Sequence, residues 1–425
     1  MGDVYPAPYS DAAQTAVVVK YHKVPRDLIG ALLPSAAICV NDFLAFNLPQ
    51  LCVPSNLGDA SACLAWSSSP PSSTLSAKLL ESLKLPEPEK LYRFLVSAPP
   101  KGTQSVRVNS LEFPLGILAV WETYLRAQQL RKYWSQSRRW LEESMRCEPA
   151  HSRVFQVALQ LFDELKWGAP IYGFKADNLC TSTATLTRIL SFSWLATSNI
   201  AHMLDLVQTD INDHGLPVRI VDPYFAEKLL MLSGKDANYY RTHSSQRHLR
   251  RLGEQFVKGE IQNLAGVVNV DGNHWIAFIA NAGAREILIA DSMVPRNSLS
   301  PSFTRYYPLT KALQWWIFHS SELAGLDITP YSVERPEVSQ QTDSNSCGIY
   351  AVNYVASYFL PSVYDPLVPM SMRCPRTAAF ISIAQRHISS EVSKSIDVSY
   401  QKRTLISHLF RVKISVGILD HQIHS

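Results

Sequence analysis

The sequence predicts an α+β fold, in which a small mixed sheet is flanked by helices and follows a mainly helical N-terminal region. Three observations predict it. Apolar residues recur at helical spacing in two stretches between residues 118 and 165. Short apolar runs between residues 218 and 335 alternate with turn signals and with further helical stretches. At 425 residues with 46% hydrophobic content, the chain is long enough to bury one large core or two smaller ones.

We expect three parts along the chain: an N-terminal region over residues 1–165, a domain over 166–400 and a C-terminal extension over 401–425. Linkers are expected near residues 67–76 and 98–104, because Pro, Gly and Ser interrupt the apolar periodicity there. No chemistry follows from the residues of the N-terminal region. A targeting or substrate-selecting role and an origin in a mobile genetic element both stay open.

In the N-terminal region a long amphipathic helix is predicted from Leu118 to Met145, with at most one break, and a second helix from Val154 to Leu165. The long helix is expected to pack on the rest of the fold, with a partner-binding helix as the alternative. After the turn-like Trp167 to Pro170 the expected order is helix, strand, helix, three strands, helix, strand and helix. The expected bounds are Trp194–Val207, Val218–Val221, Asp222–Leu232, Ala265–Asn269, Trp275–Asn281, Glu286–Asp291, Lys311–His319, Tyr331–Arg335 and a last helix opened by Cys347.

Charge and targeting signals exclude several classes of protein. The net charge of +4 is well short of a typical nucleic-acid-binding domain. The basic segments Arg131–Arg139 and Arg241–Arg251 are expected to be solvated surface, with an acidic partner or nucleic acid as the alternative. The N-terminus lacks the features of a signal peptide, and no window is apolar enough to span a membrane. We expect a location in the nucleus or cytoplasm.

The seven cysteines are scattered without a CxxC pair, so neither a zinc site nor a disulfide framework is predicted. No metal or other cofactor is expected. Reduced thiols fit best with this pattern, and a reducing compartment keeps a catalytic thiol available.

The most informative cysteine is Cys347. A polar loop gives way at Cys347-Gly348 to an apolar run with helical spacing, so the thiol is expected at a helix N-terminus, where the dipole and free N–H groups favour a thiolate. Gly348 is expected to let another backbone approach closely. The residues expected to face inward are Ile349, Val352, Tyr354, Val355 and Tyr358.

His274 is the candidate general base for this thiol. It follows a polar turn and opens a short apolar strand, and the next strand ends in Asp291. A hairpin between the strands would bring Asp291 beside His274, where a carboxylate fixes the imidazole tautomer and stabilises the imidazolium. Gln341, six residues before the cysteine, is the candidate oxyanion donor together with the Cys347 N–H. Each signal alone fits ordinary packing or capping, and the prediction depends on their conjunction.

These residues resemble the catalytic domain of the ubiquitin-like-protein-specific proteases, the SUMO-protease family of papain-related cysteine peptidases. The resemblance covers roughly Asp177 to Val398 and is carried by four segments in the family's order. They are SWLATSNIAHML from Ser193, GNHWIAFI from Gly272, ILIADSM from Ile287 and QTDSNSCGIYAVNY from Gln341. Where the family usually carries Asn-Asp after Trp-Leu, this chain has Ala196-Thr197.

The resemblance implies a papain-like fold, a catalytic triad of Cys347, His274 and Asp291, and Gln341 as the oxyanion residue. It also implies that Trp194 and Trp275 hold the Gly-Gly tail of a SUMO-like or other ubiquitin-like modifier, the expected partner together with its conjugates. Two indoles would form a slot too narrow for side chains larger than glycine's. Ordinary core packing of both tryptophans is the alternative.

Two other functions stay open at this point. One is an acetyltransferase of the same fold, and the other is an inactive pseudoprotease that binds a ubiquitin-like protein without cutting it. Neither a membrane nor nucleic acid is an expected partner.

Overall fold

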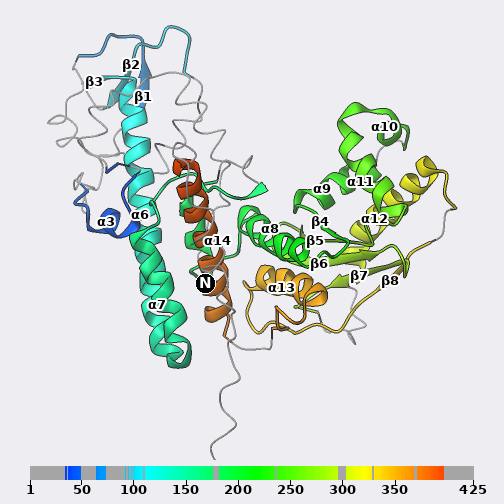
Figure 1. Cartoon of the computed structure of the whole chain (residues 1–425). Coiled ribbons are helices and arrows are strands. Elements are labelled where there is room, and N and C mark those ends of the chain that lie inside the picture. Colours follow the sequence, from blue (N-terminus) through cyan, green and yellow to red (C-terminus); the bar gives the residue numbers. More distant parts are fainter. Residues whose placement is uncertain are drawn as a thin grey trace, which may run out of the picture. The chain divides into compact units, whose positions relative to one another are not determined.

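The computed structural model describes residues 34–35, 37–48, 64–72, 91, 94, 97, 99–108, 111–175, 181–234, 237–294, 303–327, 330–367 and 371–396. Its helices, labelled in Figure 1, are α3 (Val40–Ala45), α6 (Gly116–Cys147), α7 (Ser152–Gln160), α8 (Thr197–Asp213), α9 (Tyr224–Ser233), α10 (Ala237–Thr242), α11 (Arg247–Val257), α12 (Phe303–Ala324), α13 (Cys347–Phe359) and α14 (Arg373–Ile396). Its strands are β1 (Leu64–Ser67), β2 (Ser105–Val108), β3 (Leu111–Pro114), β4 (Val218–Ile220), β5 (Asn263–Val270), β6 (His274–Asn281), β7 (Glu286–Ala290) and β8 (Ser332–Glu334). The predicted C-terminal extension, 401–425, lies outside the described residues, as do residues 73–76 of the first predicted linker.

The chain forms two compact units. The first takes in the described residues up to Glu143 together with Leu159–Pro170 and Ser182–Thr187. The second takes in Ser144–Ala158, Ile171–Thr181 and the described chain from Arg188 onward. The boundaries expected at residues 165–166 and 400–401 stay predictions.

The first unit contains a sheet as well as helices. Its strands pair antiparallel in the order β1-β2-β3, with Trp66 opposite Val106 and Val106 opposite Phe113. Val106 and Phe113 are fully buried against the beginning of α6, where Ile117 and Trp121 complete the cluster. The mainly helical region predicted from the sequence therefore also carries a three-stranded sheet, which its short strands did not reveal.

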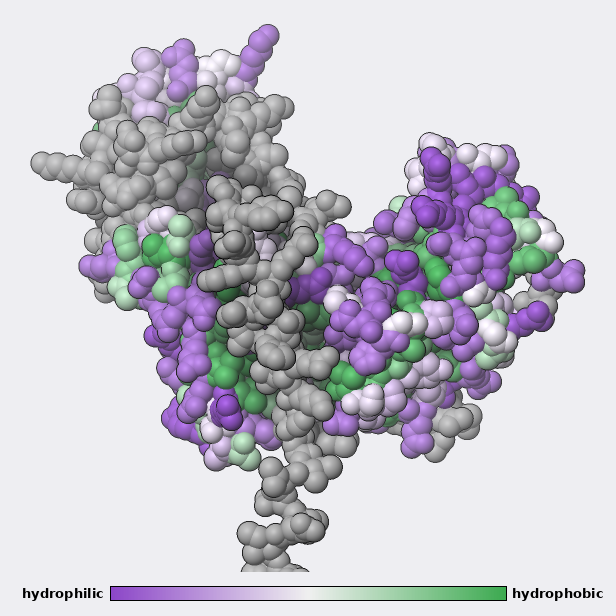
Figure 2. Space-filling view, viewed as in Figure 1, coloured by the Kyte–Doolittle hydropathy of each residue, from purple (hydrophilic) through white to green (hydrophobic). Residues whose placement is uncertain are grey.

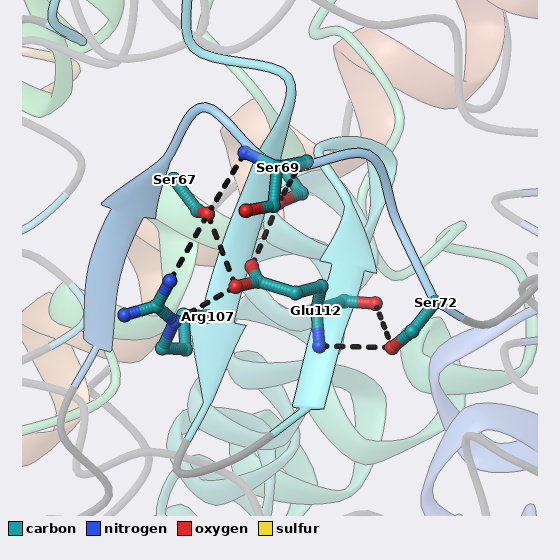
Figure 3. Close-up of polar contacts among 6 residues, drawn as sticks. Ser67, Ser69, Ser72, Arg107 and Glu112 are labelled. Atoms are coloured by element: carbon teal, nitrogen blue, oxygen red, sulfur yellow. Dashed lines mark hydrogen bonds and ion pairs between the residues drawn. The ribbon is translucent and has the colours of Figure 1, made fainter.

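Polar side chains hold the serine-rich segment after β1 against this sheet (Figure 3). The Glu112 carboxylate accepts hydrogen bonds from Arg107 Nε at 2.7 Å, from Ser105 Oγ at 2.8 Å and from Ser67 Oγ at 3.0 Å. Ser72 N–H donates to the Glu112 carbonyl at 2.9 Å. The hydrogen bond with Arg107 lowers the pKa of Glu112. The first predicted linker is thus anchored over residues 67–72.

The long helix predicted from Leu118 to Met145 is α6, and it runs without a break. Trp121, Trp134 and Leu141 on its buried face are at most 1% exposed. Trp134 Nε1 donates to the Trp167 carbonyl at 3.0 Å. The helix therefore packs on the fold through this face, as the sequence predicts.

The second unit is built on a five-stranded mixed sheet in the order β4-β5-β6-β7-β8. The edge strands pair parallel with β5 and β7, whereas β5, β6 and β7 pair antiparallel. Val270 lies opposite His274 across the first hairpin and Ala277 lies opposite Ala290 across the second. Gly272, at φ +75° in the tight turn between β5 and β6, adopts a backbone conformation that glycine favours.

Helices cover both faces of this sheet (Figure 1). Alternate residues of β6, among them Ile276 and Phe278, join one buried cluster with side chains from α9, α11 and α12. Trp275, of opposite parity, faces Gly348 at the start of α13. Because β6 is buried on both faces, its sequence is apolar throughout.

The second unit also differs from the sequence prediction in detail. Helix α8 begins at Thr197 and not at Trp194, because Asn199 Oδ1 accepts a hydrogen bond from Ala196 N–H at 3.0 Å and caps the helix there. Helix α12 is longer than expected and begins at Phe303. Helices α10, α11 and α14 were not predicted. In α13, Tyr358 does not face inward but is 42% exposed.

The basic segments have different surroundings. In the first, Arg131 donates to the Leu44 carbonyl at 2.9 Å. In the second, Arg250 donates to the Tyr240 carbonyl at 2.6 Å, whereas Arg247 and Arg251 are exposed. Hydrophilic residues cover most of the surface over α10 and α11 in the view of Figure 2. Among the helices that the structure describes, none has the length and apolar character needed to cross a membrane.

Gly348 allows close packing at the start of α13, although side chains and not a second backbone approach it. A Cβ atom at this position would lie 2.8 Å from Ile200 Cδ1, 3.2 Å from Leu195 Cδ1 and 3.3 Å from Trp275 Cδ1. We therefore expect Gly348→Ala to lower the stability by about 1–3 kcal/mol, the usual cost of overpacking. Thermal unfolding measures this, with Gly234→Ala as the control because a Cβ atom there meets nothing within 4 Å. Equal melting temperatures for the two variants would contradict the prediction.

Candidate active site

The hairpin of β6 and β7 brings His274 and Asp291 together. β6 begins at His274, one residue before the expected bound at Trp275, and Asp291 directly follows β7, which ends at Ala290. His274 Nε2 hydrogen-bonds to Asp291 Oδ1 at 2.9 Å, although the residues are 17 positions apart in sequence. Both side chains are almost fully buried, at 2% and 1% exposure. The carboxylate therefore fixes which ring nitrogen faces it and which faces away.

Two further donors hold the Asp291 carboxylate. The backbone N–H of Met293 donates to Oδ1 at 2.7 Å, and the hydroxyl of Tyr306 on α12 donates to Oδ2. Tyr306 is itself 1% exposed. Nothing in the sequence pattern indicated Tyr306, because it lies 15 residues from Asp291 and on a different element. Three donors thus fix the carboxylate in one orientation.

Cys347 is the first residue of α13, where the sequence predicts it, and it is 2% exposed. The loop before it is held by Asp343, whose Oδ1 accepts the N–H groups of Asn345 at 3.0 Å and Ser346 at 2.8 Å. Asp343 Oδ2 accepts the Ser346 hydroxyl at 2.7 Å. No hydrogen bond from the backbone N–H of Cys347 is found within the described residues. This N–H stays available for a ligand at the helix N-terminus.

His274 and Cys347 interact with each other. The Nδ1 atom of His274 is buried and makes no well-aligned hydrogen bond in the described part of the chain. Burial opposes the charged ring, but the hydrogen bonds and charge attraction of Asp291 and Cys347 together raise the pKa of His274 from 6.5 to about 9. The imidazole is therefore charged at neutral pH. Catalytic hydrogen bonds in free enzymes are often poorly aligned and tighten when substrate binds.

Gln341 is tied to the residue that follows Asp291. Its backbone N–H donates to the Ser292 carbonyl at 2.8 Å, and the Ser292 hydroxyl donates to Gln341 Oε1 at 2.6 Å. Gln341 Nε2 donates to the Asp343 carbonyl at 2.6 Å. An amide nitrogen carries two donors, and only one of them has a partner among the residues that the structure describes, so the other can bind a substrate. Ser292 belongs to the Asp-Ser pair seen in the sequence, but the sequence assigned it no role.

The two tryptophans differ in exposure. Trp194 is 45% exposed, and its Nε1 donates to the Ser344 carbonyl at 3.0 Å. Trp275 is 4% exposed, and its Nε1 donates to the Leu195 carbonyl at 3.1 Å. Both indoles therefore link the segment before α8 to other elements, Trp194 to the loop before Cys347 and Trp275 to β6.

The structure thus joins His274 to Asp291 by a hydrogen bond, lets His274 interact with Cys347, and places Gln341 beside Ser292. No group of three or more metal-ligating side chains gathers among the residues that the structure describes. The arrangement offers a thiol, a charged imidazole held by a carboxylate, and free amide donors. These are the groups that nucleophilic acyl transfer requires.

Comparison with known proteins relates this segment to a family. Residues 193–379 match the model of the Ulp1 protease family, C-terminal catalytic domain. A search of the curated proteins found no match.

Among solved structures, the chain is similar to the C-terminal Ulp1 protease domain in complex with Smt3, the yeast ortholog of SUMO, at 15% identity, over 55% of this chain and 96% of that chain, with a TM-score of 0.41. It is similar to the Chaetomium thermophilum Ulp1-like SUMO protease catalytic domain at 14% identity, over 57% and 89% of the two chains, with a TM-score of 0.38. It is also similar to the Xanthomonas campestris effector XopD bound to ubiquitin at 15% identity, over 44% and 91%, with a TM-score of 0.27. From the match to the family model we conclude that residues 193–379 belong to the Ulp1 protease family and form a cysteine protease domain with the family's catalytic fold.

Proposed function

We propose that this domain cleaves the peptide or isopeptide bond after the Gly-Gly tail of a SUMO-like or other ubiquitin-like modifier, with Cys347, His274 and Asp291 as the catalytic triad and Gln341 as the oxyanion residue. The observation that carries the proposal is the His274 ring, which hydrogen-bonds to Asp291 through Nε2 and interacts with the thiol of Cys347. A general base that activates a nucleophile needs these two partners: the nucleophile on one ring nitrogen, and on the other a third group that orients the base.

In the first half of the reaction, the Cys347 sulfur attacks the carbonyl carbon of the last glycine. The backbone N–H of Cys347 and the free donor of Gln341 bind the oxygen as negative charge develops on it; loss of one such donor typically costs ~100- to 1000-fold in rate. The carbon–nitrogen bond then breaks, and the departing amine takes its proton from the His274 imidazolium. The products are a thioester on Cys347 and a free lysine amine or peptide.

In the second half, water attacks the thioester and His274 accepts its proton. The carbon–sulfur bond breaks, the modifier leaves with a free C-terminal carboxylate, and the thiolate and imidazolium are restored. Asp291 holds the ring through both halves, so that the nitrogen facing the sulfur exchanges the proton.

Family membership and the two tryptophans support a glycine-ended tail as the substrate. Trp194 presents an exposed indole that hydrogen-bonds to the loop before Cys347, and Trp275 hydrogen-bonds to Leu195, the neighbour of Trp194. A flat aromatic slot beside the nucleophile admits glycine and excludes residues with larger side chains. Because Cys347 is 2% exposed, an entering tail has to widen the site as it binds.

A panel of modifiers that carry a C-terminal electrophile tests the proposal. SUMO-like and ubiquitin-like probes are incubated with the full chain, with Cys347→Ala and with the control Cys374→Ala, and the labelled residue is mapped by mass spectrometry. Cys374 is suited as the control because burial and the charge of Glu148 raise its pKa to about 11, so its thiol stays protonated. We expect at least one probe to label Cys347 in the wild type and in Cys374→Ala. Binding without labelling would support a pseudoprotease, and transfer of acetyl from acetyl-CoA would support an acetyltransferase.

A further inference from the structure

Arg376, on α14, is a fully buried arginine whose hydrogen bonds in the described part of the chain all go to backbone carbonyls. Nη1 donates to the carbonyls of Arg188 at 3.2 Å, Ser191 at 2.7 Å and Ser193 at 3.1 Å. Nη2 donates to Ser193 at 3.1 Å and to Asn345 at 2.8 Å. One planar guanidinium therefore gathers two segments that are about 150 residues apart in sequence, a use for which its fixed fork of donors is suited.

These two segments carry the groups proposed to bind and attack the substrate. Ser193 directly precedes Trp194, and Asn345 lies two residues before Cys347. The exposed indole of Trp194 makes a second link between the same segments through its 3.0 Å hydrogen bond to the Ser344 carbonyl. Arg376 is the buried link and Trp194 the exposed one. Together they fix how far the proposed tail slot lies from the thiol.

The charge of Arg376 also bears on the thiol. Burial lowers the pKa of Arg376 to about 10, and the charges of Asp343 and Cys347 oppose that change. The guanidinium is therefore still charged at neutral pH. Asp343 is already held by the N–H groups of Asn345 and Ser346, and its carboxylate makes no hydrogen bond to Arg376 among the described residues.

We propose that Arg376 is a positioning residue of the active site, which fixes the Trp194 segment against the loop before Cys347 and stabilises the Cys347 thiolate through its buried charge. This inference rests on the proposed role of Cys347 as the nucleophile. Within the described part of the chain, the charged and titratable groups that interact with Arg376, Cys347 or Asp343 include His274 from β6 and Tyr350 from α13.

The test compares Arg376→Met and Arg376→Lys with Arg386→Met. Arg386 lies on the same helix and also holds backbone and side chains, donating to the Gly173 carbonyl at 2.6 Å, to Thr209 Oγ1 at 3.0 Å and to Asp205 Oδ2 at 3.2 Å. Like Arg376, it ties α14 to other segments of the same unit, but in the described part of the chain it makes no hydrogen bond to either active-site segment.

The first readout is the rate at which iodoacetamide alkylates Cys347 as a function of pH, followed by mass spectrometry, which needs no protease activity. For Arg376→Met we expect the rise of this rate to move to higher pH, with alkylation at pH 6 to 7 slowed by about tenfold, because the thiolate loses a nearby positive charge. Arg376→Lys keeps the charge and is expected to keep the profile near that of the wild type. Arg386→Met is expected to leave the profile unchanged.

The second readout is kcat/KM on a modifier-tail substrate. Arg376→Lys has fewer donors in a different geometry, so we expect a loss of about tenfold or more even with the charge retained, since small displacements of reacting groups are costly. Arg376→Met should lose more, and Arg386→Met should stay within about twofold of the wild type after correction for its folded fraction.

Several outcomes separate this inference from the proposed function. A wild-type Cys347 no more reactive than the exposed Cys147 would refute the nucleophile, and with it both proposals. A reactive wild-type Cys347 with an unchanged pH profile and unchanged kcat/KM in folded Arg376→Met would overturn only the role of Arg376. If Arg376→Met does not fold, Arg376→Lys decides: a kcat/KM equal to that of the wild type overturns the positioning role, and a tenfold loss with an unshifted profile supports it.

Discussion

Cys347→Ala should lose essentially all cleavage of a modifier-tail substrate while keeping its fold. Removing the nucleophile of a catalytic triad commonly lowers kcat by ~10⁴- to 10⁶-fold. The activity that remains comes from substrate binding and oxyanion stabilisation, which assist direct attack by water. The fold should persist because alanine differs from cysteine only by the sulfur atom. Cys347 is the first residue of α13, and other buried apolar side chains of this helix keep it in place. The release of a fluorophore from the tail measures the loss, and circular dichroism checks the fold.

Cys374→Ala is the matched control for this prediction. Cys374 is a free cysteine of α14 in the same unit, and no interaction between its thiol and His274 is found among the described residues. We expect its substitution to leave kcat/KM within about twofold of the wild type. Undiminished turnover by folded Cys347→Ala would falsify the triad assignment.

Asp291→Asn should have the second largest effect and should also change the pH dependence. In the wild type the pKa of His274 is raised to about 9, so kcat/KM should fall as the pH rises above about 9 and the leaving amine loses its acid. Asparagine removes the charge attraction and supplies a weaker acceptor, so the fall should begin at lower pH. The rate at neutral pH should drop by roughly 10⁴-fold, the loss seen when the third member of such a triad is changed.

Tyr306→Phe is the graded companion of this variant. It removes one of the three donors to Asp291 but keeps the carboxylate charge, so its loss of rate should be smaller than that of Asp291→Asn.

The pH dependence of the stability gives an independent check of the His274–Asp291 pair. Because folding raises the pKa of His274 above 6.5, its stabilising contribution is complete below pH 6.5 and is lost as the pH rises through about 9. Urea unfolding midpoints that do not fall over this interval, relative to His274→Gln, would contradict the ion pair.

The parts of the site that local sequence determines could be predicted. The turn before His274, the apolar strand after it and the strand that ends at Asp291 are each encoded by neighbouring residues, and a short hairpin leaves few ways to pair them. The switch from polar to apolar residues at Cys347 likewise determines where α13 begins. The resemblance to the SUMO-protease family rested on these segments, and the match of residues 193–379 to the family model confirms it.

The remaining features depend on contacts between distant residues. Tyr306 reaches Asp291 from a helix whose first turns carried no recognised signal, and Arg376 acts through carbonyls, which every residue possesses. The strands β1–β3 are only four residues long each, too short for a periodic pattern to appear. Trp194 lies outside α8, which begins at Thr197 because Asn199 caps the helix there, and a cap is not visible in the hydrophobic pattern.

The contact between Ser292 and Gln341 links two parts of the proposed site: the Asp291–His274 pair, proposed to exchange protons, and the Gln341 amide, proposed to bind the substrate oxygen. Ser292 directly follows Asp291 in the chain. Its carbonyl accepts a hydrogen bond from the Gln341 N–H at 2.8 Å, and its hydroxyl donates to Gln341 Oε1 at 2.6 Å. A mutation or an inhibitor that displaces Ser292 or Gln341 is therefore expected to displace the other residue as well. Proton exchange and oxygen binding are then expected to be impaired together. In evolution, residues 292 and 341 would then be expected to change together. A library that varies Ser292 should yield few enzymes in which one of the two steps is impaired and the other is intact.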